Sequence, residues 1–303
     1  MNLNLGQLTT LRELARRGTM AAVADELGYT PGAVSQQIAA LEKSVNARLT
    51  TKVGRKAALT DAGIVLAQHA DRVLAAERAA LDAVLNVRDH LAAPVLLGTF
   101  GSTAAALLPA VVARARDAYP QMRLRSSELD VDDALDAVAS GRVDAAFGLD
   151  YPSVPLPRIP GIDIITLREE RFSLAISPGA YGMRTESRID LRDAAGWNWI
   201  LPPSNTHYGA AMRTVCRQHG FEPATSHEII DTAVTLALAS KGLGVAPVTD
   251  MMIGLNSSVP IIRIALVQEI MRKIVLIRPA GAAARPTVRA VTEIVQHVIS
   301  DHR

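Results

Sequence analysis

Residues 18–45 read GTMAAVADELGYTPGAVSQQIAALEKSV, and this stretch decides the fold of the N-terminal part of the chain. A helical pattern stops at Gly18, and Thr19 is a suitable N-cap for a second short helix. After a tight turn, Thr30 caps a third helix whose first position is Pro31, where a missing N–H costs no hydrogen bond. The stretch therefore predicts short helices joined by tight turns, with no strand between them.

The third helix has two contrasting faces. Its apolar residues form one narrow stripe: Val34, Ile38, Leu41 and Val45. The opposite face is small or polar and consists of Gly32, Gln36 and Lys43, flanked by Ser35 and Ala39. Gln36 can hydrogen-bond an adenine edge, and Gly32 lets the helix N-terminus approach a phosphate. This face suits the major groove of DNA, and the alternative is the solvated outside of a small three-helix core.

Residues 49–63, LTTKVGRKAALTDAG, follow the third helix. A turn at Gly54, flanked by Lys52, Arg55 and Lys56, predicts a small β wing that carries phosphate-binding charge. Helix, turn, recognition helix and basic wing then follow one another in the order of a winged helix-turn-helix.

The formal net charge of +2 is unevenly distributed along the chain. Residues 1–60 contain eight Lys or Arg against four Asp or Glu, residues 61–93 contain three against five, and residues 94–303 are balanced. The positive excess therefore lies in the N-terminal segment, where a contact with nucleic acid would use it. A basic excess of this size is also common on solvated surfaces.

As a set, these motifs resemble the LysR-type transcriptional regulators. The matching segments are Gly18-Thr19-Met20, Val23-Ala24-Asp25-Glu26-Leu27, Ala33-Val34-Ser35-Gln36-Gln37-Ile38, Leu41-Glu42, Gly54-Arg55 and Leu59-Thr60-Asp61-Ala62-Gly63. The chain departs from the family at two places. Pro31-Gly32 stands where the family usually has Gln followed by Pro or Ser, and Thr50 stands where it usually has an aromatic residue.

The resemblance implies a sequence-specific DNA-binding transcriptional regulator that is not an enzyme and needs no cofactor. It implies DNA contacts through Thr30, Pro31, Gly32, Ser35 and Gln36, and phosphate contacts through Lys52, Arg55 and Lys56. It further implies a homodimer or homotetramer on an inverted-repeat promoter site of double-stranded DNA. A small-molecule effector and RNA polymerase are the other partners that the resemblance implies.

Residues 61–93 follow the DNA-binding domain, which we assign to residues 1–60, and form one long helical pattern. Eight positions spaced by four and three are apolar except for one: Leu66, Ala70, Val73, Glu77, Ala80, Val84, Val87 and Leu91. An isolated helix of this length needs a partner, so we expect two copies of the chain to pack along this stripe. The alternative is that the helix docks on the C-terminal domain of its own chain.

Residues 94–303 alternate short aliphatic runs with helical patterns, which predicts an α/β domain with a mostly parallel sheet. Four prolines exclude a helix or central strand from residues 151–161, which we expect to be a crossing or an exposed connection. We expect two lobes with a cleft between them, lobe I at about 94–161 and 268–303 and lobe II at about 162–267; a single large sheet is the alternative. The whole chain is thus expected to be α/β, with an all-α winged helix-turn-helix and a long linker helix first. The resemblance implies that the two-lobed part is a periplasmic-binding-protein-like effector domain.

Several turns after predicted strands carry residues that could bind an effector in the cleft. These residues are Ser102, Thr103, Phe147, Leu149, Pro202, Ser204 and Thr232. Hydroxyls and free N–H groups at such turns bind polar ligands, although simple N-capping explains each hydroxyl equally well. The acids Asp130, Asp150 and Asp231 fall at comparable strand ends with no Arg in view, which favours a cationic or amino-bearing effector.

The remaining features exclude several classes of protein. A single cysteine, Cys216, rules out a disulfide within the chain and leaves either core packing or an oxidation sensor. His207, His219 and His227 share no ligand spacing typical of a metal site, and no hydrolase, P-loop or zinc-protease motif is present. The N-terminus lacks a signal-like apolar block and no segment is apolar enough to span a membrane, so we expect a cytoplasmic protein. The competing hypothesis is a cytosolic small-molecule-binding α/β protein or enzyme whose N-terminal helices serve only oligomerisation.

Overall fold

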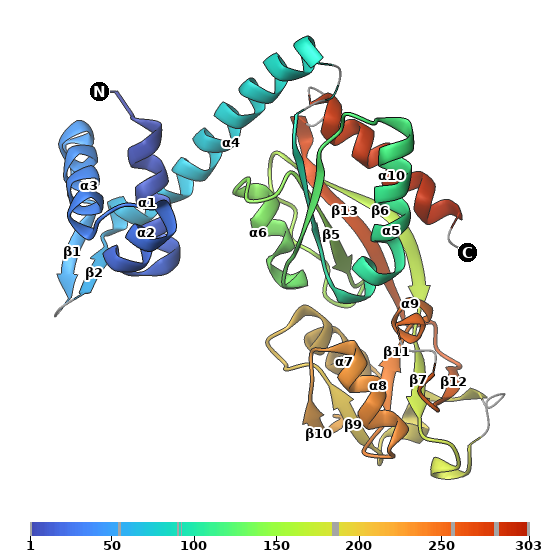
Figure 1. Ribbon diagram of the computed structural model, residues 1–303. Coiled ribbons are helices and arrows are strands. Elements are labelled where there is room, and N and C mark those ends of the chain that lie inside the picture. Colours follow the sequence, from blue (N-terminus) through green and yellow to red (C-terminus); the bar gives the residue numbers. More distant parts are fainter. Residues whose placement is uncertain are drawn as a thin grey trace. The chain divides into compact units, whose positions relative to one another are not determined.

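The computed structural model describes residues 2–301 except 54–55, 90, 92, 184–187, 256–257 and 282–284. The backbone is described but the side chains are not at residues 52–53, 56, 79, 82–83 and 85–89. The chain divides into two compact units (Figure 1). Unit 1 comprises Met1–Arg88 and Ala139–Arg142, and unit 2 comprises Asp89–Val138 and Val143–Arg303.

Unit 1 is a three-helix domain with a two-stranded wing. Its elements are α1 (Leu5–Arg17), α2 (Met20–Leu27), α3 (Pro31–Val45), β1 (Thr50–Val53), β2 (Lys56–Leu59) and α4 (Asp61–Asp89). The predicted caps are confirmed: Thr19 accepts a hydrogen bond from the N–H of Ala22, Thr30 accepts one from Ala33, and Gly18 is left-handed at φ 71°. The antiparallel pair β1–β2 confirms the predicted wing.

The core of unit 1 follows the predicted apolar stripe of α3. Val34, Ile38 and Leu41 are completely or almost completely buried, and Leu8 and Leu11 of α1 meet them. Burial of each such aliphatic side chain contributes about 2 kcal/mol to the free energy of folding. The stripe that makes α3 a helix therefore also fixes which of its faces is left for solvent.

Helix α4 begins inside this core. Gly63, in its first turn, lies so close to the wing that a Cβ there would stand 2.1 Å from the carbonyl oxygen of Leu49. Ala67 and Ala70 are buried in the same core and Leu66 packs against it. Only a glycine lets the long helix start at this point.

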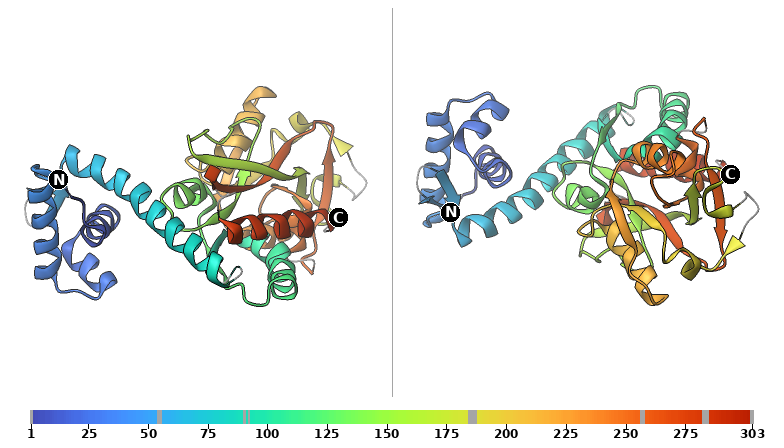
Figure 2. Two further views of the ribbon diagram at one scale, coloured as in Figure 1. Left: turned by 90° about the horizontal axis from the view of Figure 1, so that it is seen from above. Right: turned by 90° about the horizontal axis from the view of Figure 1, so that it is seen from below.

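The later part of α4 has a different environment. Figure 2 shows α4, in light blue to cyan, as one uninterrupted helix. Val73, Leu81 and Val84 are 38 %, 58 % and 68 % exposed. The predicted dimer stripe is therefore wrong in its first part, because Leu66 and Ala70 are used by the core of unit 1.

Lobe I of unit 2 is built on a five-stranded sheet in the order β4-β3-β5-β13-β6. Its elements are β3 (Val95–Thr99), α5 (Gly101–Ala118), β4 (Leu124–Glu128), α6 (Ala134–Ala139), β5 (Ala145–Asp150), β6 (Ile162–Arg171), β13 (Met271–Pro279) and α10 (Pro286–Asp301), with a 3-10 turn η1 at Val131–Asp133. Helices α5 and α10 lie side by side (Figures 1 and 2). The sheet is mostly parallel, as predicted, except that β13 runs antiparallel to its neighbours β5 and β6.

Lobe II contains a four-stranded sheet, β11-β7-β12-β8, and the separate parallel pair β10-β9. Its elements are β7 (Ser173–Ile176), β8 (Arg188–Ile189), β9 (Asn198–Leu201), α7 (His207–Gln218), β10 (Ala224–Glu228), α8 (Thr232–Ser240), β11 (Ala246–Val248), α9 (Asp250–Gly254) and β12 (Ile262–Leu266), with 3-10 turns η2 (Ala180–Gly182) and η3 (Leu191–Ala194). Separate sheets in the two lobes exclude the single large sheet.

The predicted lobe boundary needs a correction. Strand β6, placed in lobe II by the sequence, pairs along its length with β13 in the sheet of lobe I. The proline-rich residues 151–161 therefore connect β5 to β6 within lobe I and are not a crossing. The chain crosses between lobes at β6–β7 and again between β12 and β13, at about residues 172 and 270.

We predict that Gly63→Ala destabilises unit 1 by about 2 kcal/mol or more, because a carbonyl group and not a flexible side chain blocks the new methyl group. Hydrogen exchange followed by mass spectrometry would report the loss as faster exchange across residues 5–64. The matched control is Gly32→Ala, where the new Cβ meets nothing closer than 3.9 Å and should not accelerate exchange. Equal protection in the two variants would contradict the packing described.

Candidate nucleic-acid interface and ligand cavity

The exposed face of α3 carries the residues that the sequence singled out. Pro31, Gly32, Ser35 and Gln36 are exposed, on the side away from the buried stripe. The hydroxyl of Thr30 accepts a hydrogen bond from Ala33, so its side chain serves as the helix cap. The first turns of α3 thus present small groups and one amide to solvent, as a reader of base edges would.

The neighbouring amide, Gln37, has a different role. Its Oε1 accepts a hydrogen bond of 3.1 Å from the hydroxyl of Thr10 in α1. Gln37 therefore fixes α3 against α1, and of the two adjacent glutamines only Gln36 faces outward.

A carboxylate holds the wing against α3. Glu42 accepts hydrogen bonds from the N–H groups of Leu49 and Thr50, at 2.8 and 3.0 Å, and from the Thr50 hydroxyl at 3.2 Å. Burial alone would raise the pKa of the Glu42 carboxyl, but these bonds and the nearby Arg48 charge lower it overall. Thr50, which departs from the family pattern, thus joins the wing to the recognition helix through a polar contact.

The predicted phosphate-binding residues of the wing lie partly outside the described residues. Arg55 lies outside the described residues, and the side chains of Lys52 and Lys56 are also outside the description. The backbones of Lys52 and Lys56 lie in β1 and β2, on either side of the wing turn.

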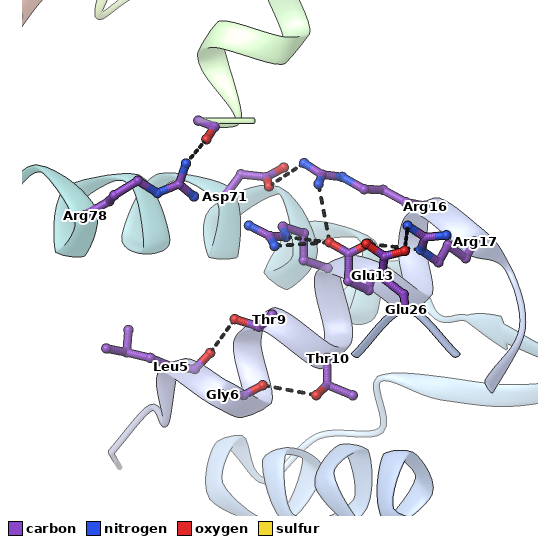
Figure 3. A network of polar contacts seen from close by, with 12 residues as sticks. Leu5, Gly6, Thr9, Thr10, Glu13, Arg16, Arg17, Glu26, Asp71 and Arg78 are labelled. Atoms are coloured by element: carbon purple, nitrogen blue, oxygen red, sulfur yellow. Dashed lines mark hydrogen bonds and ion pairs between the residues drawn. The ribbon is translucent and has the colours of Figure 1, made fainter. Parts of the chain in front are cut away.

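Several N-terminal arginines are engaged within unit 1 (Figure 3). The buried carboxylate of Glu13 contacts three of them: Arg12, Arg16 and Arg17. Arg17 also contacts Glu26 at 2.6 Å, and Arg16 contacts Asp71 of α4 at 3.1 Å. The charge excess of residues 1–60 is therefore partly used to join α1, α2 and α4. Of the other basic residues in this segment, Lys43 and Arg48 lie outside this network, and the side chains of Lys52, Arg55 and Lys56 are not among those described.

The contact between Arg16 and Asp71 fixes geometry more than it adds stability. Burial raises the pKa of Asp71 and lowers that of Arg16, so for each partner desolvation outweighs the attraction of the other. A pair of this kind adds little net free energy, but it sets how α4 leaves the three-helix core.

Unit 2 contains a cavity of about 760 Å³ between its two lobes. Lobe I contributes the N-terminus of α5 at Gly101 and Ser102, and the segment from Glu128 to Asp132. Lobe II contributes residues next to the N-termini of α7 and α8, including Thr206, Tyr208, Asp231 and Thr232. The carboxyl ends of strands from both lobes meet here, which is where open α/β folds bind ligands.

The structure brings four of the seven predicted effector residues to this cavity: Ser102, Leu149, Pro202 and Thr232. The other three do not line it. Thr103 is fully buried one residue further around α5, and Phe147 is buried in the core three residues before the end of β5. Ser204 is exposed on the turn before α7 and does not reach the cavity.

An arginine that the sequence did not reveal lies at the cavity. Arg272, on β13, is 2 % exposed and lines it. Its guanidinium donates to Glu170 at 2.8 Å and to the hydroxyl of Thr249 at 2.8 Å, and it lies over the ring of Phe172. The expectation of no Arg near the acids was therefore wrong, although Glu170 balances the charge of Arg272.

A second contact crosses between the lobes. The backbone N–H of His207, at the start of α7, donates to Asp132 of η1 at 2.9 Å, and its ring nitrogen lies 3.5 Å from the same carboxylate. Ser153 of lobe I donates to the carbonyl of Ala211 in α7. These bonds hold the two walls of the cavity together.

Three further features of the sequence concern Cys216, metal binding and membrane insertion. Cys216 is 2 % exposed, and burial raises the pKa of its thiol to about 12, so it is core packing rather than a reactive thiolate. Among the described residues, no three His, Cys, Asp or Glu side chains gather as metal ligands. No helix in the described part of the chain has the length and apolarity to cross a bilayer.

Two family models match the chain. A bacterial regulatory helix-turn-helix model of the LysR family matches residues 5–64, and a LysR substrate-binding domain model matches residues 88–300. The chain belongs to the LysR family of transcriptional regulators. As a member of that family it is a regulator and not an enzyme.

Known LysR regulators are similar over most of the chain. The HTH-type transcriptional regulator BenM of Acinetobacter baylyi is 25 % identical over 74 % of this chain and 72 % of its own. Full-length OxyR of Pseudomonas aeruginosa has a TM-score of 0.68 at 17 % identity, over 99 % of this chain and 95 % of its own. Full-length CbnR in complex with its target DNA has a TM-score of 0.64 at 20 % identity, over 98 % and 100 %.

We predict that Glu42→Gln weakens unit 1 of this LysR regulator by about 1–2 kcal/mol near neutral pH, because hydrogen bonds to a charged acceptor are the stronger ones. The pKa of Glu42 is lowered on folding, so its stabilisation is present above the ordinary value of 4.5 and is lost as the pH falls through the lowered value. Thermal unfolding followed by circular dichroism should therefore separate the two proteins at pH 7 and bring them together in acid. A difference that persists unchanged below pH 4 would contradict this role.

Proposed function

We propose that this LysR regulator reads promoter DNA with the exposed edge of α3. The observation that carries the proposal is the division of α3 into a buried apolar stripe and an exposed edge of small and amide side chains. Base edges would meet Gln36 and Ser35, while Thr30, Pro31 and Gly32 bring the helix N-terminus close to the DNA backbone. The wing residues Lys52, Arg55 and Lys56 would hold phosphates. The fold that CbnR uses on its target DNA supports this assignment.

The proposal includes a second copy of the chain. The exposed apolar residues of α4, Val73, Leu81 and Val84, favour packing of the later part of residues 61–93, beyond the stretch buried in unit 1, against a partner, as a homodimer or a homotetramer. Two recognition helices related by a twofold axis would match an inverted repeat. Such a regulator acts in the cytoplasm on promoters, where RNA polymerase is its further protein partner.

We also propose that a small-molecule effector binds in the cavity of unit 2. Ser102, Leu149, Pro202 and Thr232 line it from both lobes, so a ligand there would bridge the lobes and change their closure. Effector binding would then alter the affinity for DNA by linkage. The match of residues 88–300 to a substrate-binding domain model supports this assignment.

The test of DNA reading uses two variants in electrophoretic mobility assays with promoter and random DNA. Gln36→Ala should reduce the discrimination between the two by about tenfold, because an amide contact to a base is lost. Lys52→Ala should weaken binding to both alike and lower the salt dependence, because it removes a phosphate contact.

A matched control, Gln37→Ala, removes an amide that faces α1 and should leave discrimination unchanged in protein that remains folded. If Gln36→Ala and Lys52→Ala have the same effect on both DNAs, the assignment of α3 to the groove is wrong.

A further inference from the structure

The cavity of unit 2 is lined by carboxylates from both lobes. Lobe I contributes Glu128, Asp130 and Asp132, and lobe II contributes Asp231. These four side chains surround one space of about 760 Å³, so a ligand there experiences their combined field.

The described basic groups do not balance these acids. Arg272 is the one Lys or Arg among the described lining residues. It forms an ion pair with Glu170, with 2.7 Å between Nη2 of Arg272 and Oε2 of Glu170. In the described part of the chain, Glu128, Asp130 and Asp231 have no ion pair with Lys or Arg. Four acids therefore face the cavity with one compensated arginine beside them.

Helix and turn capping explains why some of these acids stand where they do, but it does not explain why they are charged. Asp130 accepts a hydrogen bond from the N–H of Asp132, and Asp231 accepts one from Val234 at the start of α8. Asn would serve equally well as a cap at either position. Asp132 accepts the N–H of His207 at the start of α7. The cavity thus stays electronegative after the two helix ends of lobe II are satisfied.

The N-terminus of α5 lines the same cavity with uncharged polar groups. Phe100 provides no side-chain cap there, and Ser102, only 5 % exposed, lines the cavity without a hydrogen bond to any described residue. A buried hydroxyl left unpaired costs free energy unless a ligand or water meets it. Ser102 therefore offers, independently of the acids, a free hydroxyl to a polar group of a ligand in this space.

Much of the remaining lining is apolar. Leu129, Leu149, Ile230, Met252 and Leu255 surround the polar groups, and Ile230 is 63 % exposed. Such side chains favour a hydrocarbon body on the ligand.

From these observations we propose that the effector of this regulator carries a protonated amine on an apolar body, with the ammonium held among Asp130, Asp132 and Asp231. This inference rests on the proposed role of the cavity as the effector site and specifies the chemistry of its ligand. A ligand with carboxylates alone would meet like charge from both lobes.

The test compares probes that differ only in the sign of their charge. Phenethylamine is compared with phenylacetate and cadaverine with glutarate, each at about 10 mM, in thermal unfolding of the full chain followed by tryptophan fluorescence. Both tryptophans, Trp197 and Trp199, lie in unit 2, so the signal reports the unit that holds the cavity. At least one amine should raise the midpoint by about 2 °C or more, and the matched acid should not.

The double variant Asp130→Asn, Asp231→Asn keeps both caps and removes two charges, so it should raise the Kd of the amine about tenfold in titration calorimetry. The matched control is Asp117→Asn, an exposed acid of α5 outside the cavity lining, which should leave the Kd unchanged.

Three outcomes would overturn the proposal: an acid that stabilises the chain as well as its matched amine, no shift by either amine, or an amine affinity unaffected by the double variant. A shift by the acids would leave the cavity as the effector site and reject only the ligand class. The mobility assay on DNA decides the regulator assignment separately.

Discussion

The buried ion pair between Glu170 and Arg272 is the contact on which the architecture of unit 2 depends. The two residues face each other across the β6–β13 pair, at the end of the lobe I sheet where the chain crosses to lobe II. Glu170 also accepts from the hydroxyl of Thr249 and the N–H of Met251, which lead from β11 into α9. One carboxylate thus joins the sheet of lobe I to an element reached from lobe II, and α9 lies at this junction in Figure 1.

Burial of such a pair is expensive, since both charges lose their hydration. Here the cost is offset because the Glu170 carboxylate has three donor groups and the Thr249 hydroxyl both donates and accepts. The network fixes the floor of the cavity, to which Arg272 and Met252 contribute directly. Carboxylates play a similar part in unit 1. Glu13 positions the helices through ion pairs, and Glu42 positions the wing through hydrogen bonds.

The sequence revealed what depends on local pattern and missed what depends on distant pairing. The caps at Thr19 and Thr30 and the buried stripe of α3 are visible because neighbouring residues create them. Ser102 and Leu149 were predicted from their place at strand ends, but the same rule also selected Thr103, whose side chain points into the core. Arg272 could not be found, because its partner Glu170 lies 102 residues away and only the β6–β13 register brings them together. The same long-range pairing explains why β6 belongs to lobe I and not, as predicted, to lobe II.

The most direct test of this account is a double-mutant cycle on Glu170→Gln and Arg272→Met, in urea unfolding followed by the fluorescence of Trp197 and Trp199. Each single variant should lower the free energy of unfolding of unit 2 by about 3–5 kcal/mol, because it leaves one charge or polar group buried without its partner. The double variant should lose well under the sum, with a coupling of about 2 kcal/mol or more. Additive losses would contradict the claim that this pair joins the lobes beneath the cavity.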